Sequence, residues 1–174
     1  MKQEVILLLG SNMGNREELL QQARETLNSK VGTITQLSEL YETEPWGFEA
    51  QHDFLNQVVT LQSELDAHTL LSRTQEIEAH AGRVRAADGR FISRTLDIDI
   101  LFYANQQIDT PELQVPHPHL HKRRFTLIPL TDNHAEMQHP TLHKTIRQLL
   151  DECPDKLPVK NYTATHKHKK AASY

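Results

Sequence analysis

The chain alternates between short apolar runs and longer segments in which apolar residues recur every three or four positions. The apolar runs predict β-strands, because successive side chains of a strand point to opposite faces and a buried strand is apolar on both. The predicted strands cover residues 5–9, 33–43, 54–61 and 96–102. In the last strand we expect Asp97 and Asp99 on one face, opposite an apolar face of Leu96, Ile98, Ile100 and Phe102.

The segments with helical spacing predict two long helices and two short ones. Asn15 is placed to cap a helix that extends to about residue 29, and Asp66 is placed to cap another over residues 67–81. The buried stripe of this second helix should be Leu70, Thr74, Ile77 and Ala81. Pro129 should shorten or kink a helix over 125–130, because proline has no N–H to donate. A last helix is expected to begin at His139.

The size and charge of the chain limit the classes of protein to which it can belong. A length of 174 residues suits one domain, assigned to residues 1–158, and the polar tail over 159–174 is predicted to be disordered. The net charge of -4 argues against general nucleic-acid binding. A single cysteine, with no signal-peptide pattern and no membrane-spanning stretch, predicts a cytoplasmic protein with no membrane partner. We expect a monomer.

An acidic pair that follows an arginine cluster marks the candidate chemistry. Asp97 and Asp99 would lie about 7 Å apart on one face of a strand, where two carboxylates repel each other unless a cation is near. The arginines that precede them are Arg83, Arg85, Arg90 and Arg94. Arginine binds phosphate through two parallel hydrogen bonds. The combination favours a site where Mg²⁺ meets phosphate, while the acidic pair alone is also typical of an ordinary half-exposed strand.

Other polar residues suggest ligand contacts with less specificity. His117, His119 and His121 alternate, which could indicate zinc. The intervening prolines disfavour a regular strand, so phosphate binding by His117 and Arg123 is the better interpretation. Asn56, beside an aromatic residue, could bind the edge of a flat heterocycle through its amide. Neither G-x-G-x-x-G nor G-x-x-x-x-G-K-[ST] is present, so the glycine-rich nucleotide motifs are excluded.

Taken in order, these segments resemble the 6-hydroxymethyl-7,8-dihydropterin pyrophosphokinases of folate biosynthesis over about residues 4 to 155. The most specific match is Arg94-Thr95-Leu96-Asp97-Ile98-Asp99. Weaker matches are Leu9-Gly10-Ser11-Asn12, Tyr41 to Gly47, Asp53-Phe54-Leu55-Asn56, Gln75 to Glu78, Gly82 to Arg85, and Val115-Pro116-His117. The resemblance implies an α+β fold with a ferredoxin-like antiparallel sheet between helix layers, a three-layer α/β/α arrangement.

The resemblance also implies a reaction and a role for each matching residue. The family transfers the pyrophosphoryl group of ATP to the hydroxymethyl group of the pterin and releases AMP. Asp97 and Asp99 would hold two Mg²⁺ ions, and Arg83 and Arg94 would support catalysis. The ATP contacts would be Gln75, Glu78, His117 and Arg123. The pterin contacts would be Thr43, Pro45, Trp46, Phe54, Asn56 and Phe125.

Two departures and two alternatives accompany this resemblance. Phe91-Ile92-Ser93 replaces a Trp-Gly-Pro segment of the family, and Glu112 and Gln114 replace residues that contact ATP in some members, so those contacts are not carried over. The alternatives are a His-rich zinc-binding protein and an inactive pterin- or nucleotide-binding protein.

Overall fold

The structure is a computed structural model that describes residues 1–44, 53–82 and 96–162. Its strands are β1 (Gln3–Ser11), β2 (Thr33–Leu37), β3 (Tyr41–Thr43), β4 (Phe54–Ser63), β5 (Asp97–Tyr103), β6 (Ile108–Asp109), β7 (Gln114–Val115) and β8 (Val159–Asn161). Its α-helices are α1 (Arg16–Lys30), α2 (Ala67–His80), α3 (Arg124–His134) and α4 (Ile146–Asp151), with a 3-10 turn over Leu120–Lys122. Within these ranges no helix is long and apolar enough to cross a membrane.

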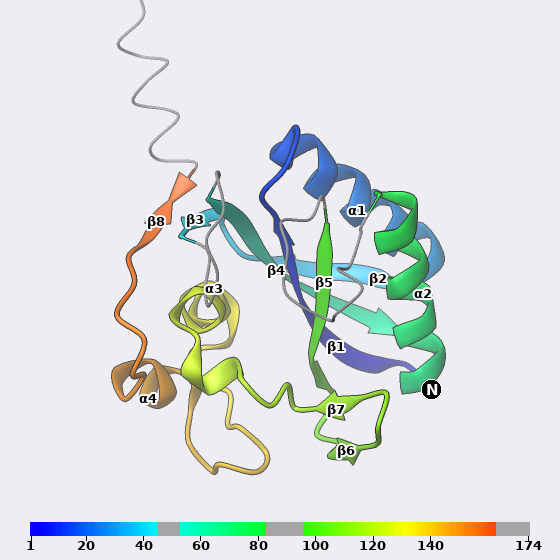
Figure 1. Ribbon diagram of the computed structural model, residues 1–174. Helices are drawn as coiled ribbons and strands as arrows, with labels where there is room; N and C mark the ends of the chain where they lie inside the picture. The colour runs from blue at the N-terminus through cyan, green and yellow to red at the C-terminus, as the bar shows by residue number, and fades with distance from the viewer. Residues whose placement is uncertain (45–52, 83–95, 163–174) are drawn as a thin grey trace, which may run out of the picture.

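An antiparallel sheet separates two layers of helices (Figure 1). Its strands follow the order β5-β1-β4-β3-β8, and β2 also pairs with β4. Helices α1 and α2 cover one face, where they follow β1 and β4 in the chain, and α3 and α4 lie on the other face (Figure 1). The predicted α+β fold, with an antiparallel sheet between helix layers, is confirmed.

Strand β1 supplies both cores of the molecule. Val5, Leu7 and Leu9 pack in the core under α1 and α2. Ile6 and Leu8 pack in the core under α3 and α4. Because alternate residues serve opposite layers, the run is apolar throughout, as expected for a central strand covered on both faces.

Strand β5 contains an irregularity that the sequence pattern did not predict. Ile6 pairs with Phe102 whereas its neighbour Leu7 pairs with Ile100, so one extra residue is inserted in β5. Such a bulge reverses the alternation beyond it. Phe102 therefore packs in the core beside α3, and the expectation that it shares a face with Ile100 is wrong. Asp97, which pairs with Gly10, keeps the predicted orientation away from Ile98 and Ile100.

Three other predicted boundaries are corrected. The strand expected over 33–43 is two strands, β2 and β3, because Ser38 turns inward and donates its backbone N–H to Val58 (2.9 Å). The last helix begins at Ile146 and not at His139, since the capping box that opens it is formed by Thr145 and Gln148. The tail expected from residue 159 does not begin there, because β8 pairs with β3. Residues 163–174 lie outside the described ranges.

The predicted helix caps are confirmed. The Asn15 side chain accepts a hydrogen bond from the Glu18 N–H at 3.2 Å, and Asp66 accepts one from the Thr69 N–H at 3.0 Å. Pro129 is accommodated inside α3, which extends to His134 and is longer than predicted. These caps fix where α1 and α2 begin, and thus which of their residues reach the sheet.

Candidate active site

A cleft of about 390 Å³ follows the outer edge of β5. Four of the residues assigned to ATP or metal from the sequence line it: Gln75, Glu78, Asp99 and His117. The other lining residues are Leu71, Ile98, Ile100, Pro111, Glu112, Leu113, Gln114 and Pro118. Its volume is in the range of small-molecule sites, about 300–1,000 Å³. The structure therefore gathers residues from α2, β5 and the segment after β7 around one polar opening.

Glu78 joins α2 to the edge of β5. Its Oε1 accepts a hydrogen bond from the Ile98 N–H at 3.3 Å, and the residue is 4% exposed. The predicted stripe of α2 placed Ile77 and Ala81 in the core, whereas Glu78 is the buried residue of that turn. A carboxylate is buried there because β5 is an edge strand whose N–H groups need an acceptor. Gln75 is exposed and faces the cleft one turn earlier.

His117 is close enough to both Asp97 and Arg123 to be influenced by their charges. Burial, the Arg123 guanidinium and His119 lower the pKa of His117 to about 4, while Asp97 acts in the opposite direction. The ring is therefore neutral at pH 7. Its Nδ1 accepts a hydrogen bond from the His119 N–H at 3.2 Å, so Nε2 carries the proton and is a donor. The His117 N–H bonds the Leu101 carbonyl at 3.0 Å, which holds the residue against β5.

A second group of predicted residues forms a polar cradle on the adjoining strands. The buried Asn56 amide donates to Thr43 Oγ1 at 2.8 Å. Phe54 pairs with Thr43 across the β3-β4 ladder. Both Asn56 and Phe54 approach Gly10: a Cβ there would lie 3.1 Å from Asn56 Oδ1 and 3.6 Å from Phe54 Cδ1. We call Thr43, Phe54 and Asn56 the amide cradle.

Gly10 lies between this cradle and the acidic pair. It pairs with Asn56 on one side and with Asp97 on the other, so the three residues form a row across β4, β1 and β5. Directly paired residues of neighbouring strands share a face of the sheet. Because glycine has no side chain, the Asn56 amide and the Phe54 ring can approach the middle of this row closely. The two predicted subsites therefore adjoin on one face, the face covered by α3.

The start of α3 completes that face. Phe125 packs against the core that contains Leu8 and Val58, on the same side as the cradle. The Arg123 guanidinium lies 5.7 Å from the centre of the Phe125 ring. The arrangement sets a cation beside an aromatic face, close to His117.

Four of the predicted site residues lie outside the described residues: Pro45, Trp46, Arg83 and Arg94. Their assignments stay predictions. The described residues do show that both arginines belong to the segment connecting α2 to β5, the two elements that border the cleft.

The donor set of the site fits Mg²⁺ better than zinc. Within the described ranges no three or more His, Cys, Asp or Glu side chains are grouped so that they could hold a metal by themselves. Magnesium is typically held by one or two carboxylates together with substrate phosphates and water. Asp97 and Asp99 supply that number of carboxylates. The rings of His117 and His119 are 5.9 Å apart and tilted, and the histidine run gives no support to a zinc site.

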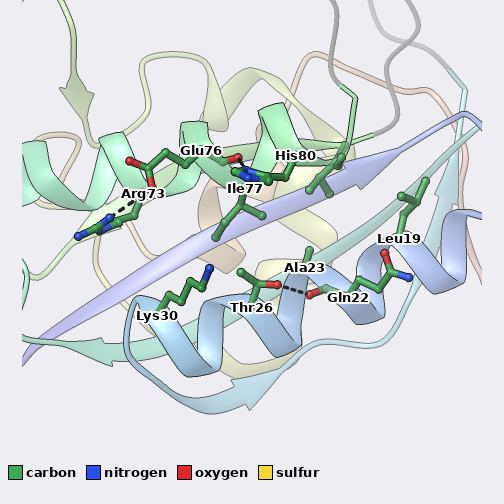
Figure 2. Close-up of a pocket in the computed structure, with 11 residues that line it drawn as sticks. Leu19, Gln22, Ala23, Thr26, Lys30, Arg73, Glu76, Ile77 and His80 are labelled. Atoms are coloured by element: carbon green, nitrogen blue, oxygen red, sulfur yellow. Dashed lines mark hydrogen bonds and ion pairs between the residues drawn. The ribbon is translucent and has the colours of Figure 1, made fainter.

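A smaller cavity of about 220 Å³ lies between α1 and α2, on the opposite face of the sheet (Figure 2). Figure 2 shows Ile77 and Ala23 pointing toward each other across it, with Lys30 and Arg73 at one end. None of the site residues predicted from the sequence lines this cavity. It marks incomplete packing of the two helices, which leaves Ile77 only partly buried.

Sequence reasoning missed a long-range connection beside the cradle. The Asp132 carboxylate on α3 accepts hydrogen bonds from the Tyr41 hydroxyl at 2.8 and 3.0 Å and from the Glu39 N–H at 2.9 Å. Burial and the Asp132 carboxylate raise the pKa of Tyr41 well above its usual value, so its hydroxyl is protonated and donates at pH 7. Ninety-one residues separate the pair in the chain, so no local pattern could have indicated it.

Comparison with known proteins gives one consistent family. The family model described as 7,8-dihydro-6-hydroxymethylpterin-pyrophosphokinase (HPPK) matches residues 6–135. The chain is similar to the 2-amino-4-hydroxy-6-hydroxymethyldihydropteridine pyrophosphokinase of Porphyromonas gingivalis, with 47% identity over 130 residues, 74% of this chain and 88% of the relative. The enzyme of the same name from Bacillus subtilis is 42% identical over 127 residues, 72% of this chain and 75% of the relative.

Solved structures show the same fold at low sequence identity. The structure titled HPPK-DHPS in complex with substrates has a TM-score of 0.73 at 16% identity over 87% of this chain. Wild-type Plasmodium falciparum HPPK-DHPS has a TM-score of 0.70 at 18% identity, again over 87% of this chain. This chain spans only 43% and 45% of those two proteins. They support the arrangement of the layers and no more.

Proposed function

Because the chain belongs to the 7,8-dihydro-6-hydroxymethylpterin-pyrophosphokinase family, we propose that it transfers a pyrophosphoryl group from ATP to 6-hydroxymethyl-7,8-dihydropterin and releases AMP. As such it is an ATP-dependent diphosphotransferase of folate biosynthesis. The observation that carries the site assignment is the row of Asn56, Gly10 and Asp97. The row supports the proposal because an amide suited to a heterocycle lies next to a carboxylate suited to a metal ion, as transfer between two bound substrates requires.

The ATP side is the cleft along β5. Asp97 and Asp99 would hold two Mg²⁺ ions against the triphosphate. The metal ions would neutralise phosphate charge and stabilise the charge that develops on the leaving AMP. His117, neutral at pH 7, would donate a hydrogen bond from Nε2 to a phosphate oxygen, and Arg123 would contribute a fixed positive charge. Gln75 and Glu78 border the same cleft and are assigned to the nucleotide.

The pterin side is the amide cradle. Asn56 and Thr43 offer donors and acceptors to the edge of a flat ring, and burial strengthens such bonds because water does not compete. Phe54 and Phe125 approach from different elements of the same face and would pack on the two sides of the ring. Pro45 and Trp46 complete this assignment, as predicted from the sequence.

A catalytic role for the loop arginines follows from the chemistry. Transfer to the pterin must outcompete transfer to water, so the reacting phosphate has to be enclosed and its charge balanced. Arg83 and Arg94, which connect α2 to β5, are the cations assigned to that task. An inactive binding protein would have no use for both the acidic pair and these arginines, which is why the active enzyme is preferred.

The metal assignment is tested with Asp99→Asn, matched to Asp151→Asn on the exposed face of α4. Asp99→Asn should reduce turnover at least 100-fold and leave the thermal midpoint close to wild type, since about 3 kcal/mol of transition-state stabilisation corresponds to that factor. Asp151→Asn should retain full activity. Wild-type turnover in Asp99→Asn would show that the reaction does not need the Asp99 carboxylate. Zinc that survives dialysis in stoichiometric amount would support the alternative zinc protein.

A monomer in the cytoplasm remains the expected state of the enzyme. The pterin cradle and the ATP cleft are both built from one chain, and no second copy is needed to complete either. Sedimentation of the purified full chain at micromolar concentration measures the oligomeric state directly. A single species near 20.0 kDa is the expected result.

A further inference from the structure

Arg16 makes three contacts behind the amide cradle. As the first residue of α1, it forms an ion pair with Glu42, with Nη2 2.7 Å from Oε2. Its other terminal nitrogen, Nη1, donates to the Asp53 carbonyl at 2.8 Å. The guanidinium also lies 5.5 Å from the centre of the Tyr162 ring. One side chain thus connects four segments that are far apart in the sequence.

The two polar contacts flank the outer end of the β3-β4 ladder. Glu42 precedes Thr43, and Asp53 precedes Phe54, while Thr43 and Phe54 are the last pair of the ladder. Glu42 pairs with Leu55, which packs in the core under α1 and α2. Arg16 therefore acts from the face of the sheet opposite the cradle and does not touch the pterin position.

Tyr162 connects the same point to the C-terminal strand. Its backbone N–H donates to the Leu40 carbonyl at 2.9 Å, directly after β8 pairs with β3. Burial and a hydrogen bond to Glu17 raise the pKa of its hydroxyl to about 12, so the hydroxyl is protonated at pH 7. The ring is thereby held between α1 and β3, where it covers Arg16.

We propose that Arg16 is a positioning residue for the pterin subsite, which holds the ends of β3 and β4 together so that Thr43 and Asn56 keep their hydrogen-bonded geometry. The assignment rests on the proposed function of the cradle. Guanidinium suits this task because its planar fork can serve a carboxylate and a carbonyl at once, whereas an ammonium presents one charged point. The ion pair is only partly exposed, with side chains 21% and 29% accessible, so solvent screens it less than a surface pair.

The test compares Arg16→Gln with Arg147→Gln. Arg147 also pairs with a glutamate, Glu136, but on an exposed surface away from the ladder. For Arg16→Gln, fluorescence titration with 6-hydroxymethyl-7,8-dihydropterin should give a dissociation constant raised about 3- to 10-fold, the factor that losing a partly buried ion pair and a hydrogen bond supports. ATP affinity and kcat at saturating pterin should stay within about twofold. Arg147→Gln should match wild type in all three quantities.

Two further variants separate positioning from simple stabilisation. Arg16→Lys keeps the ion pair but loses the second contact, so its pterin affinity should fall between those of wild type and Arg16→Gln. Tyr162→Leu removes the ring over the guanidinium and should weaken pterin binding by a smaller factor, with ATP unaffected. A lowered thermal midpoint in Arg16→Gln with an unchanged ratio of pterin to ATP affinity would overturn the proposal. Wild-type protein that binds no pterin would instead refute the proposed function.

Discussion

Gly10 offers the sharpest test of the shared face between the two subsites. In Gly10→Ala the new Cβ would lie 3.1 Å from Asn56 Oδ1, closer than an ordinary van der Waals contact, and 3.6 Å from Phe54 Cδ1. The amide must therefore move by a few tenths of an ångström. Among the described residues, the added methyl meets only these two cradle residues within 4 Å, and not Asp97. The substitution should therefore weaken pterin binding and leave binding at the acidic pair unchanged.

The expected magnitude follows from the buried amide. Displacing Asn56 weakens its 2.8 Å hydrogen bond to Thr43 and shifts the groups that face the heterocycle. A buried hydrogen bond contributes about 1 kcal/mol, and a buried group left unsatisfied costs about 1–3 kcal/mol. Since each 1.4 kcal/mol is tenfold in affinity, the range of about 1–3 kcal/mol corresponds to a rise of about 5- to 150-fold in the dissociation constant of the pterin.

The assay is fluorescence titration with the pterin, accompanied by ATP-analogue binding on the same samples. The matched control is Gly32→Ala, whose Cβ would lie 2.3 Å from the Gln62 carbonyl oxygen, at the far end of the sheet. That variant should lose thermal stability and retain the ratio of pterin to ATP affinity. Unchanged pterin affinity in a folded Gly10→Ala protein would contradict the assignment of the cradle to the pterin, because the described atoms nearest the methyl belong to Asn56 and Phe54.

Two further predictions concern catalysis and pH. Arg94→Ala should lower kcat by at least tenfold with ATP affinity nearly unchanged, because a cation that stabilises developing charge acts mainly in the transition state; weakened ATP binding at normal kcat would contradict this. Burial lowers the pKa of both His117 and His139 from 6.5 to about 4, so between these values the unfolded chain binds protons that the folded chain does not. The free energy of unfolding should therefore fall as pH drops from about 6.5 to 4, and His117→Gln should flatten that decline in urea-denaturation series. An unchanged pH slope in His117→Gln would show that the ring is not buried in the neutral form.

Short-range sequence patterns were enough to predict the structural features that depend only on residues close together in the chain. The caps at Asn15 and Asp66, the central strand β1 and the orientation of Asp97 all follow from short-range patterns, and all are confirmed. The bulge that redirects Phe102 was not predictable, because alternation in a single strand carries no information about its partner's register.

The missed parts of the site depend on contacts between distant segments. Glu78 was assigned to ATP, but its hydrogen bond to the Ile98 N–H was not predicted, because a helix pattern cannot show that an edge strand needs an acceptor beside it. The contacts of Asp132 with Tyr41, and of Arg16 with Asp53, likewise join residues on different elements. The resemblance to the family named the groups expected to meet substrate, whereas the groups that support them emerged only from the structure.

Product analysis of the purified chain is the most direct test of the proposed pyrophosphoryl transfer. The protein is incubated with ATP, Mg²⁺ and 6-hydroxymethyl-7,8-dihydropterin, and the products are separated and identified. AMP and a pterin diphosphate in equal amounts are predicted, with neither formed when the pterin or Mg²⁺ is left out. ADP with a pterin monophosphate, or no pterin-dependent product at all, would contradict the central claim that this sheet face brings the two substrates together for pyrophosphoryl transfer.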